Sequence, residues 1–325
     1  MAAGGCLVDG QRSHVTVQTP SKESTSLTNY EAQNRVKASF DDVYTASTPH
    51  GYLKKMTAVD YRMATLMNPF VSAVVDASAT TDGPVKVLDV GCSYGISGAL
   101  LKTNCAYEDL ADFYRHEASP EFSACVTETR RWLGFRSQRE DVEVVGFDSS
   151  EPAINFATAS NMLDAGIARN LEAHESQLSS AERSLIQQCD VLLSTGAIGY
   201  VTDRTVGPIL EEFGHCGHGA LGPVAIISVL ELFDPESIAR TFTEHGFRFG
   251  PLSVRLPQRR FVDEAERRSV IGALQQRGLP AAAQESEKTM FANLWIAAHP
   301  DRFQELTRCL SKTYDEVSGP VLVGC

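Results

Sequence analysis

The sequence predicts an α/β domain built on a seven-stranded, mostly parallel, doubly wound sheet. From residue 83 onward, short runs of β-branched and other apolar residues alternate with segments of helical periodicity. This alternation is typical of strand–helix–strand units, which place successive strands parallel in one sheet. A glycine-containing turn over residues 89–95 joins the first strand to the helix that follows it. With 325 residues, the chain is long enough for one such domain with appended segments.

The expected strands and helices follow one another along the domain. Apolar runs predict strands at residues 85–90, 142–148, 170–175, 190–194, 223–230, 252–256 and 290–298. Helical periodicity predicts helices that begin near residue 96 and cover residues 152–165, 203–213 and 235–245. In sheets of this kind ligands bind outside the carboxyl ends of the strands. We therefore expect binding residues in the loops that follow the parallel strands.

Three segments are expected along the chain. Residues 1–28 are rich in Gly, Ser, Thr and Gln and predict a disordered tail. Residues 29–82 predict a helical lid segment, with a helix interrupted at Pro69. Residues 83–325 predict the sheet domain, with helical insertions at residues 102–140 and 257–288. In the second insertion, Asp263 and Glu266 predict a capping box at a helix start.

Composition favours a globular protein that acts on a small molecule. The formal net charge is −12, whereas nucleic-acid-binding domains are normally basic, so we expect no nucleic-acid partner. The eight cysteines form no C-x-x-C pair, and we expect no metal site. The sequence contains neither an apolar run of membrane-spanning length nor a secretory signal. These features predict no membrane association and a cytoplasmic location.

The turn over residues 89–95 has the composition of a nucleotide-binding turn. Small residues let the backbone approach a ligand closely, and a helix N-terminus follows. A dinucleotide fingerprint, G-x-G-x-x-G, would place glycines at positions 91, 93 and 96, and the chain has Gly91, Ser93 and Ile96 there. The spacing therefore does not match a dinucleotide site.

The turn resembles instead the first motif of class I, Rossmann-like S-adenosylmethionine-dependent methyltransferases of the small-molecule type. That motif is an acid, one residue, and then G-x-G-x-G. Asp89, Gly91 and Gly95 match it, and Ser93 replaces the middle glycine. The resemblance implies a Rossmann-like methyltransferase sheet with S-adenosyl-L-methionine as cofactor. It implies cofactor contacts from the turn residues Asp89, Gly91, Cys92, Ser93, Tyr94 and Gly95.

Later loops supply the other cofactor residues that the resemblance implies. Asp148, followed by Ser149, ends the second strand, where family members place an acid that takes both ribose hydroxyls. A carboxylate has two oxygens and can accept both donors. Asn170 and Leu171 are expected beside the adenine. The loop after the fourth strand is expected to face the cofactor through Ser194, Thr195 and Gly196.

The acceptor is expected to be bound by a second set of residues. Arg259 and Arg260 follow the sixth strand and could clamp an acidic acceptor. By analogy with the family, Tyr44 and Tyr52 are placed on a lid and Tyr200 at the border of the acceptor pocket. A hydroxyl acceptor normally needs a base, and Glu231 is the only candidate in the loops after the fourth and fifth strands. A carboxylate acceptor needs none, because it is already ionised.

These observations favour a methyltransferase that modifies an oxygen, preferably a carboxylate, of a small acidic or aromatic metabolite. No catalytic residue is assigned. The chain also resembles microbial and fungal carboxyl O-methyltransferases of secondary metabolism, although no motif specific to them is present. Hydroxyl and amine acceptors stay open as alternatives, as does a protein that binds S-adenosylmethionine without transferring the methyl group. The oligomeric state is also open, with a homodimer as one candidate.

Overall fold

The structure is a computed structural model that describes residue 1 and residues 30, 33–39, 43–103, 105–217 and 219–321, with side chains up to residue 316. Apart from Met1, the predicted disordered tail lies outside the described residues. Seven strands form one sheet in the order β3-β2-β1-β4-β5-β7-β6. All neighbouring pairs are parallel except the two that involve β7, which runs antiparallel to β5 and β6. The predicted fold class is confirmed.

The strands lie close to the predicted positions, with two exceptions. Their bounds are β1 Val85–Val90, β2 Val142–Asp148, β3 Ala165–Ala168, β4 Val191–Ser194, β5 Val224–Leu230, β6 Arg248–Arg260 and β7 Thr289–Ala298. The exceptions are β3, predicted at residues 170–175, and β6, predicted at 252–256.

The third strand was predicted too late in the chain. β3 consists of small residues with weak strand propensity, yet it pairs with β2 from Val145 to Asp148. Its Gly166 packs against α7 (Glu151–Ala159), where an added Cβ would lie 2.6 Å from the Ile154 side chain. The helix predicted over 152–165 therefore ends six residues early. Tertiary packing of small residues, which local propensity does not register, determines this strand.

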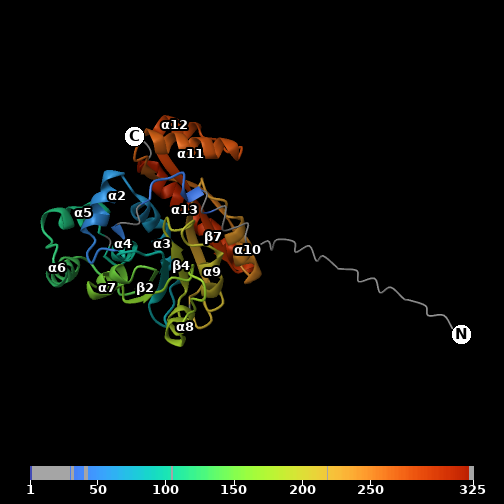
Figure 1. Ribbon diagram of the computed structural model, residues 1–325. Helices are drawn as coiled ribbons and strands as arrows, with labels where there is room; N and C mark the ends of the chain where they lie inside the picture. The colour runs from blue at the N-terminus through green and yellow to red at the C-terminus, as the bar shows by residue number, and fades with distance from the viewer. Residues whose placement is uncertain (2–29, 31–32, 40–42, 104, 218, 322–325) are drawn as a thin grey trace.

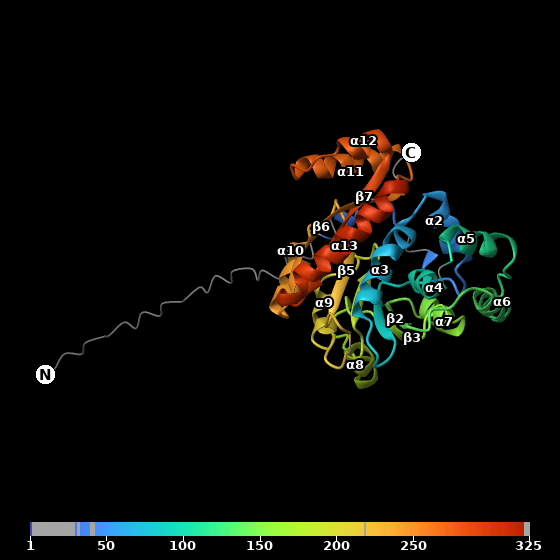
Figure 2. The same ribbon diagram turned by 180° about the vertical axis from the view of Figure 1, so that it is seen from behind.

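Helices cover both faces of the sheet (Figures 1 and 2). One buried cluster joins the sheet to α3, α4, α7 and α13, and a second joins it to α8, α9, α10 and α11. Figure 2 shows α3 and α13 lying side by side on the first face. The bounds not yet given are α2 His50–Ala58, α3 Met63–Ser78, α4 Ile96–Thr103, α5 Tyr107–His116, α6 Phe122–Gly134, α8 Ser180–Gln187, α9 Asp203–Leu210, α10 Glu236–Glu244, α11 Glu264–Gln276, α12 Ala282–Glu287 and α13 Pro300–Val321.

The N-terminal helices differ in part from the predicted lid. Pro69 lies inside α3 without ending it, so the predicted interruption is wrong. Val74 and Val75 of this helix are completely buried, and such packing offsets the hydrogen bond that proline cannot donate. α3 is therefore a helix of the core. Only the residues that precede α3 could therefore form the predicted lid.

Helices lie in both of the segments expected as insertions. Residues 102–140 contain α5 and α6, and residues 257–288 contain the end of β6 followed by α11 and α12. The capping box predicted at the start of α11 is only half formed: Asp263 accepts from the Glu266 N–H, but the Glu266 side chain turns elsewhere. Within the described residues, no helix has the length and apolar character needed to cross a membrane.

Candidate functional site

A cavity of about 620 Å³ lies at the carboxyl ends of the parallel strands. Loops after β1, β2, β3 and β4, the ends of β5 and β6, and the N-terminal segment before α3 all contribute to its lining. This is the edge at which doubly wound sheets bind ligands. Its volume falls within the usual range for small-molecule sites.

The turn after β1 forms one wall of the cavity. Gly91, Cys92 and Ser93 line it directly. Gly91 has φ +78°, and a Cβ there would lie 2.3 Å from the Cβ of Ala197, so only glycine fits. Ser93 has φ +50°, and its N–H donates to Asp148 Oδ2 at 2.8 Å. The β1 turn is thus bonded to the end of β2.

Two residues of the predicted cofactor set face away from the cavity. Gly95 packs against Ala157, Met162 and Leu163, so it supports the turn from behind. Tyr94 is fully buried, and its hydroxyl is within hydrogen-bond distance of the carbonyl oxygens of Val43, at 3.0 Å, and Ala46, at 2.7 Å. Neither Tyr94 nor Gly95, both predicted to contact the cofactor, is among the residues that line the cavity. Tyr94 holds the N-terminal segment instead.

Asp148 lies where the loops after β1 and β2 meet. Its Oδ1 accepts from the Ser150 N–H at 2.8 Å, while its Oδ2 accepts from Ser93. Burial raises the pKa of Asp148, although these backbone N–H groups act in the opposite direction. Each oxygen keeps a second lone pair, and the residue lines the cavity beside Ser149. Asp148 can therefore still accept hydrogen bonds from a ligand.

Asp89 is a buried carboxylate without a hydrogen-bond donor in the described structure. Its exposed fraction is 1%, and neither Oδ1 nor Oδ2 has a hydrogen-bond partner. Burial, with a further contribution from the charge of Asp148, raises the pKa of Asp89 to about 7. Asp89 lies behind the lining residues and acts electrostatically on Tyr52 and Tyr61. Its carboxylate therefore forms no hydrogen bond to the turn within the described structure.

The loops after β3 and β4 place most of the remaining predicted residues at the cavity. Asn170, Leu171, Thr195 and Gly196 line it. Ser194 does not, because its hydroxyl donates to the Val90 carbonyl at 3.0 Å inside the sheet. The expectation that Ser194 faces the cofactor is therefore corrected.

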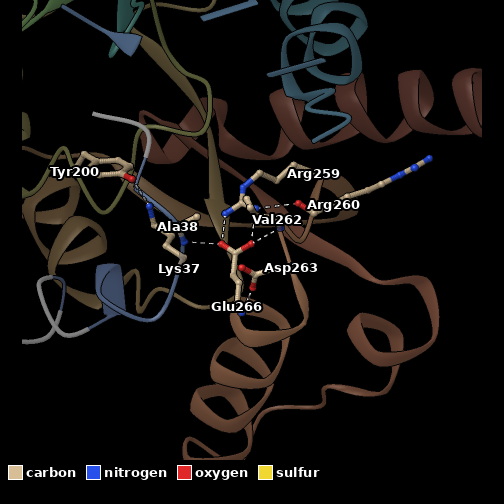
Figure 3. A network of polar contacts seen from close by, with 8 residues as sticks. All are labelled: Lys37, Ala38, Tyr200, Arg259, Arg260, Val262, Asp263 and Glu266. Carbon is tan, nitrogen blue, oxygen red and sulfur yellow. Dashed lines mark hydrogen bonds and ion pairs between the residues drawn. The ribbon is translucent and has the colours of Figure 1, made fainter. Parts of the chain in front are cut away.

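Aromatic residues form another part of the lining. Tyr44, Tyr52 and Tyr200, which were predicted to bind the acceptor, line the cavity together with Tyr61 from the turn between α2 and α3. The rings of Tyr44 and Tyr52 are 5.6 Å apart, a normal aromatic contact. Tyr200 is 42% exposed, and its ring lies 3.9 Å from Lys37 Nζ. The Lys37 ammonium also donates a hydrogen bond to the Tyr200 hydroxyl, as Figure 3 shows.

The two arginines predicted to clamp an acidic acceptor are arranged differently. Arg259 lines the cavity, but Nη2 and Nη1 donate to the two oxygens of Glu266 at 2.6 and 3.0 Å (Figure 3). Arg260 points away from this pair, is 69% exposed in its side chain and lies 3.6 Å from Asp60. It is absent from the cavity lining. The expected two-arginine clamp is therefore not formed.

Glu266 joins three parts of the chain. Besides Arg259, it accepts from the backbone N–H groups of Ala38, at 2.6 Å, and Val262, at 2.7 Å. Burial opposes its ionisation, but hydrogen bonding and charge attraction from Arg259 outweigh burial, and the pKa of Glu266 lies below its ordinary value. The pair therefore exists as a buried ion pair that neutralises the guanidinium at the cavity wall.

Sequence reasoning missed several residues of the cavity. Gln258 and Tyr61 line it, as does Ser150, which donates to the Tyr44 carbonyl. No sequence motif marks either residue: Tyr61 precedes the α3 segment by two positions, and Gln258 is a single amide beside Arg259 and Arg260. Glu231, the candidate base, does not line the cavity, because it pairs with Arg255 at 2.6 Å. Among the described residues there is no cluster of three or more potential metal ligands.

Neither a protein-family model nor a curated protein matches the sequence. Solved structures that match in fold include a TehB-like S-adenosylmethionine-dependent methyltransferase from Corynebacterium glutamicum, at 13% identity and TM-score 0.36, over 70% of this chain and 87% of that one. The plantazolicin methyltransferase BpumL, solved with S-adenosylhomocysteine, matches at 15% identity and TM-score 0.37, over 86% and 98%. The CurJ carbon methyltransferase matches at 13% and 0.42, over 85% and 67%.

Proposed function

We propose that the protein is an S-adenosylmethionine-dependent methyltransferase that acts on a small molecule. The observation that carries the proposal is the junction of the β1 turn and the end of β2. There Gly91, Cys92 and Ser93 line the cavity, and Asp148 both accepts a hydrogen bond from the Ser93 N–H and lines the cavity beside them. This is the arrangement that the resemblance of the Asp89–Gly95 motif implies.

The chemistry of the cavity fits this cofactor. S-adenosylmethionine carries an ammonium group and a sulfonium. Asp89 is a buried carboxylate that accepts no hydrogen bond from any described residue. A cation held near Asp89 would favour its ionised form. Asp148 would accept the ribose hydroxyls, while Asn170 and Leu171 would contact the adenine. The groups that would bind the cofactor therefore line the cavity, except Asp89, which lies behind the lining residues.

When bound, the cofactor supplies an electrophilic methyl group, and in-line transfer depends mainly on positioning. The chain contributes by holding its N-terminal segment across this region. Tyr94 bonds to Val43 and Ala46, and Ser150 bonds to Tyr44. Tyr44, Thr45 and Tyr52 thereby become part of the lining, which limits access of water to the reacting groups.

The acceptor atom that we propose is an oxygen. The preference for a carboxylate depended on two free arginines and on the lack of a base. Glu266 already binds Arg259, and Arg260 lies outside the cavity, so the electrostatic support for an acid is removed. A hydroxyl acceptor, one of the alternatives left open by the sequence, is favoured by the contacts at Gln258 described in the next subsection.

Titration calorimetry with S-adenosylmethionine and S-adenosylhomocysteine tests the cofactor assignment. Asp148→Ala should weaken binding roughly a hundredfold, because it removes two charge-assisted acceptors and the tie to Ser93. Asp141→Ala is the matched control, since Asp141 is an aspartate outside the cavity. Absence of binding by the unaltered protein would refute the proposal. Binding without methyl transfer to any acceptor would leave only a cofactor-binding protein.

A further inference from the structure

Gln258 occupies a β-bulge at the end of β6. The register between β6 and β7 passes from Pro257–Phe291 to Arg259–Met290, so Gln258 is one extra residue on the β6 side. Buried residues alternate along β6 from Leu252 through Gln258, and the burial of Arg259 directly after Gln258 breaks this alternation. A bulge re-aims side chains in this way and often occurs beside a functional site. Here Gln258 and Arg259 are adjacent in the chain, and both line the cavity.

The Gln258 side chain is buried with an unused acceptor. The residue is 5% exposed, and its Oε1 has no hydrogen-bond partner among the described residues. Its Nε2 is close to the loop after β4, since a Cβ added to Gly196 would lie 3.3 Å away. Thr195 in that loop also lines the cavity with an unpartnered Oγ1, while its carbonyl accepts from Tyr61 at 3.3 Å. The wall thus offers an amide oxygen and a hydroxyl without partners.

Burial of an unpartnered amide oxygen costs free energy, so a ligand that supplies a donor would be favoured there. Gln284 differs from Gln258 in position: its Oε1 is also unpartnered among the described residues, but Gln284 lies on α12 and does not line the cavity. A hydroxyl group can donate to Gln258 Oε1 and also accept a hydrogen bond. A carboxylate can only accept, and it would face the amide oxygen with like partial charge.

The charges near Gln258 give an acid little attraction. Arg259 is the adjacent cation, and its guanidinium is paired with Glu266 at 5% exposure of both side chains. Lys37 also lines the cavity, where its ammonium group contacts the exposed Tyr200 ring. The surrounding wall is apolar and aromatic, with Met56, Ala64 and Phe233 beside the tyrosines. Such a wall suits a flat, uncharged ring.

We propose that the methyl acceptor is an uncharged aromatic compound whose hydroxyl group is held by Gln258 and Thr195. This inference depends on the proposed methyltransferase function and specifies its substrate class. In the reaction the methyl carbon exchanges its bond to sulfur for a bond to the acceptor oxygen. Sulfur keeps the bonding electron pair and becomes a neutral thioether, and the hydroxyl proton leaves to bulk solvent as the oxygen–carbon bond forms. A phenolic hydroxyl, with a pKa of about 10 as in tyrosine, depends less on a side-chain base than an alkyl hydroxyl does.

Binding to the protein loaded with S-adenosylhomocysteine tests the inference, with naphthol and naphthoic acid as paired probes on one ring system. At near-neutral pH, titration calorimetry should show naphthol binding at least tenfold more tightly than naphthoic acid. Gln258→Leu should weaken naphthol binding roughly tenfold, the effect of losing one hydrogen bond and stranding its partner. Gln284→Leu, which alters a buried glutamine outside the cavity, should leave it unchanged.

The result that would overturn the inference is naphthoic acid binding as tightly as naphthol or more tightly, or naphthol binding that Gln258→Leu leaves unaltered. Binding of neither probe to the loaded protein would also overturn it. Failure of the proposed methyltransferase function can be told apart from failure of the acceptor inference. It would appear as a lack of S-adenosylhomocysteine binding before any probe is added. Thermal unfolding of each variant distinguishes a lost contact from a lost fold.

Discussion

At the scale of single residues, the buried carboxyl group of Asp89 makes both stability and ligand binding depend on pH. Its carboxylate is buried beneath the cavity without a donor, and its pKa is raised to about 7 from 3.8. Since its pKa is higher in the folded than in the unfolded chain, protonation favours the folded state. The unliganded protein therefore loses stability as pH rises from about 4 through 7. A bound cation would reverse this loss by stabilising the ionised form.

Asp89→Asn should accordingly have opposite effects on the free and the liganded protein. Without ligand, the variant should unfold at a higher temperature than the unaltered protein, and more so at pH 8 than at pH 5. The gain in the free energy of unfolding is at most roughly 4 kcal/mol, because the pKa of Asp89 lies about three units above its ordinary value. Its affinity for S-adenosylmethionine should fall, since it cannot carry the charge that attracts the ammonium group.

Two measurements check this prediction: thermal unfolding across pH and titration calorimetry. In the unaltered protein, affinity should increase as pH rises through 7 and then level off, because ionised Asp89 binds the cation better. Asp89→Asn should lack this pH dependence. Equal pH profiles for both proteins would show that Asp89 does not face the cationic part of the ligand.

At the scale of elements, the N-terminal segment is attached to the sheet through a small number of hydrogen bonds. The Tyr94 hydroxyl reaches the Val43 and Ala46 carbonyls, and Ser150 reaches Tyr44. The backbone N–H of Arg62 donates to the Gln258 carbonyl at 3.0 Å, which fixes the other end of the segment to the β6 bulge. Residues after β1 and β2, together with the end of β6, thereby hold residues 43–62, the covering segment, against the cavity.

Tyr94→Phe should weaken the attachment of the covering segment without altering the residues that contact the cofactor. We expect cofactor affinity to fall roughly tenfold, because the ligand must then also order the segment. Tyr114→Phe is the matched control, since it also removes a buried hydroxyl, bonded to Thr129 at 2.8 Å, but away from the cavity. Equal affinities of the two variants would contradict a covering role for residues 43–46.

At the scale of the whole molecule, Glu266 connects parts that are distant in sequence. It is the third residue of α11, and it binds Arg259 of β6 and the backbone of Ala38 (Figure 3). Removing one partner of a buried ion pair leaves an uncompensated charge, a large cost compared with that of an exposed pair. The second helical insertion is thus joined to the sheet and to the N-terminal segment by one carboxylate.

Glu266→Gln should therefore destabilise the protein by roughly 3 kcal/mol near neutral pH. Glu264→Gln, in an exposed pair with Arg267 on the same helix, should have little effect. Because Arg259 lowers the pKa of Glu266, the pair stabilises the fold above the ordinary value of 4.5 and loses this contribution as pH falls below it. Denaturant unfolding should show the difference between Glu266→Gln and the unaltered protein shrinking in acid. A difference that persists at low pH would contradict an ionic role.

The sequence alone determined the alternation of strands and helices, the turn that excludes a dinucleotide and the acid at the end of β2. These features are local, because strand periodicity, glycine spacing and an adjacent carboxylate do not depend on distant residues. The tertiary structure decided the rest. Ala165–Ala168 forms a strand because it pairs with β2 and packs on α7. Tyr94 contacts the N-terminal segment, and Arg259 forms an ion pair with Glu266.

The acceptor site in particular could not be predicted from the sequence. A single bulge places the buried Arg259 beside the buried Gln258 at the cavity, and a bulge is visible only in the pairing with β7. Whether Arg259 offers a free charge depends on a helix that begins five residues later and folds back onto it. Charge and hydrogen-bonding capacity at a site depend on which partners are already bound, and only the three-dimensional structure supplies that information.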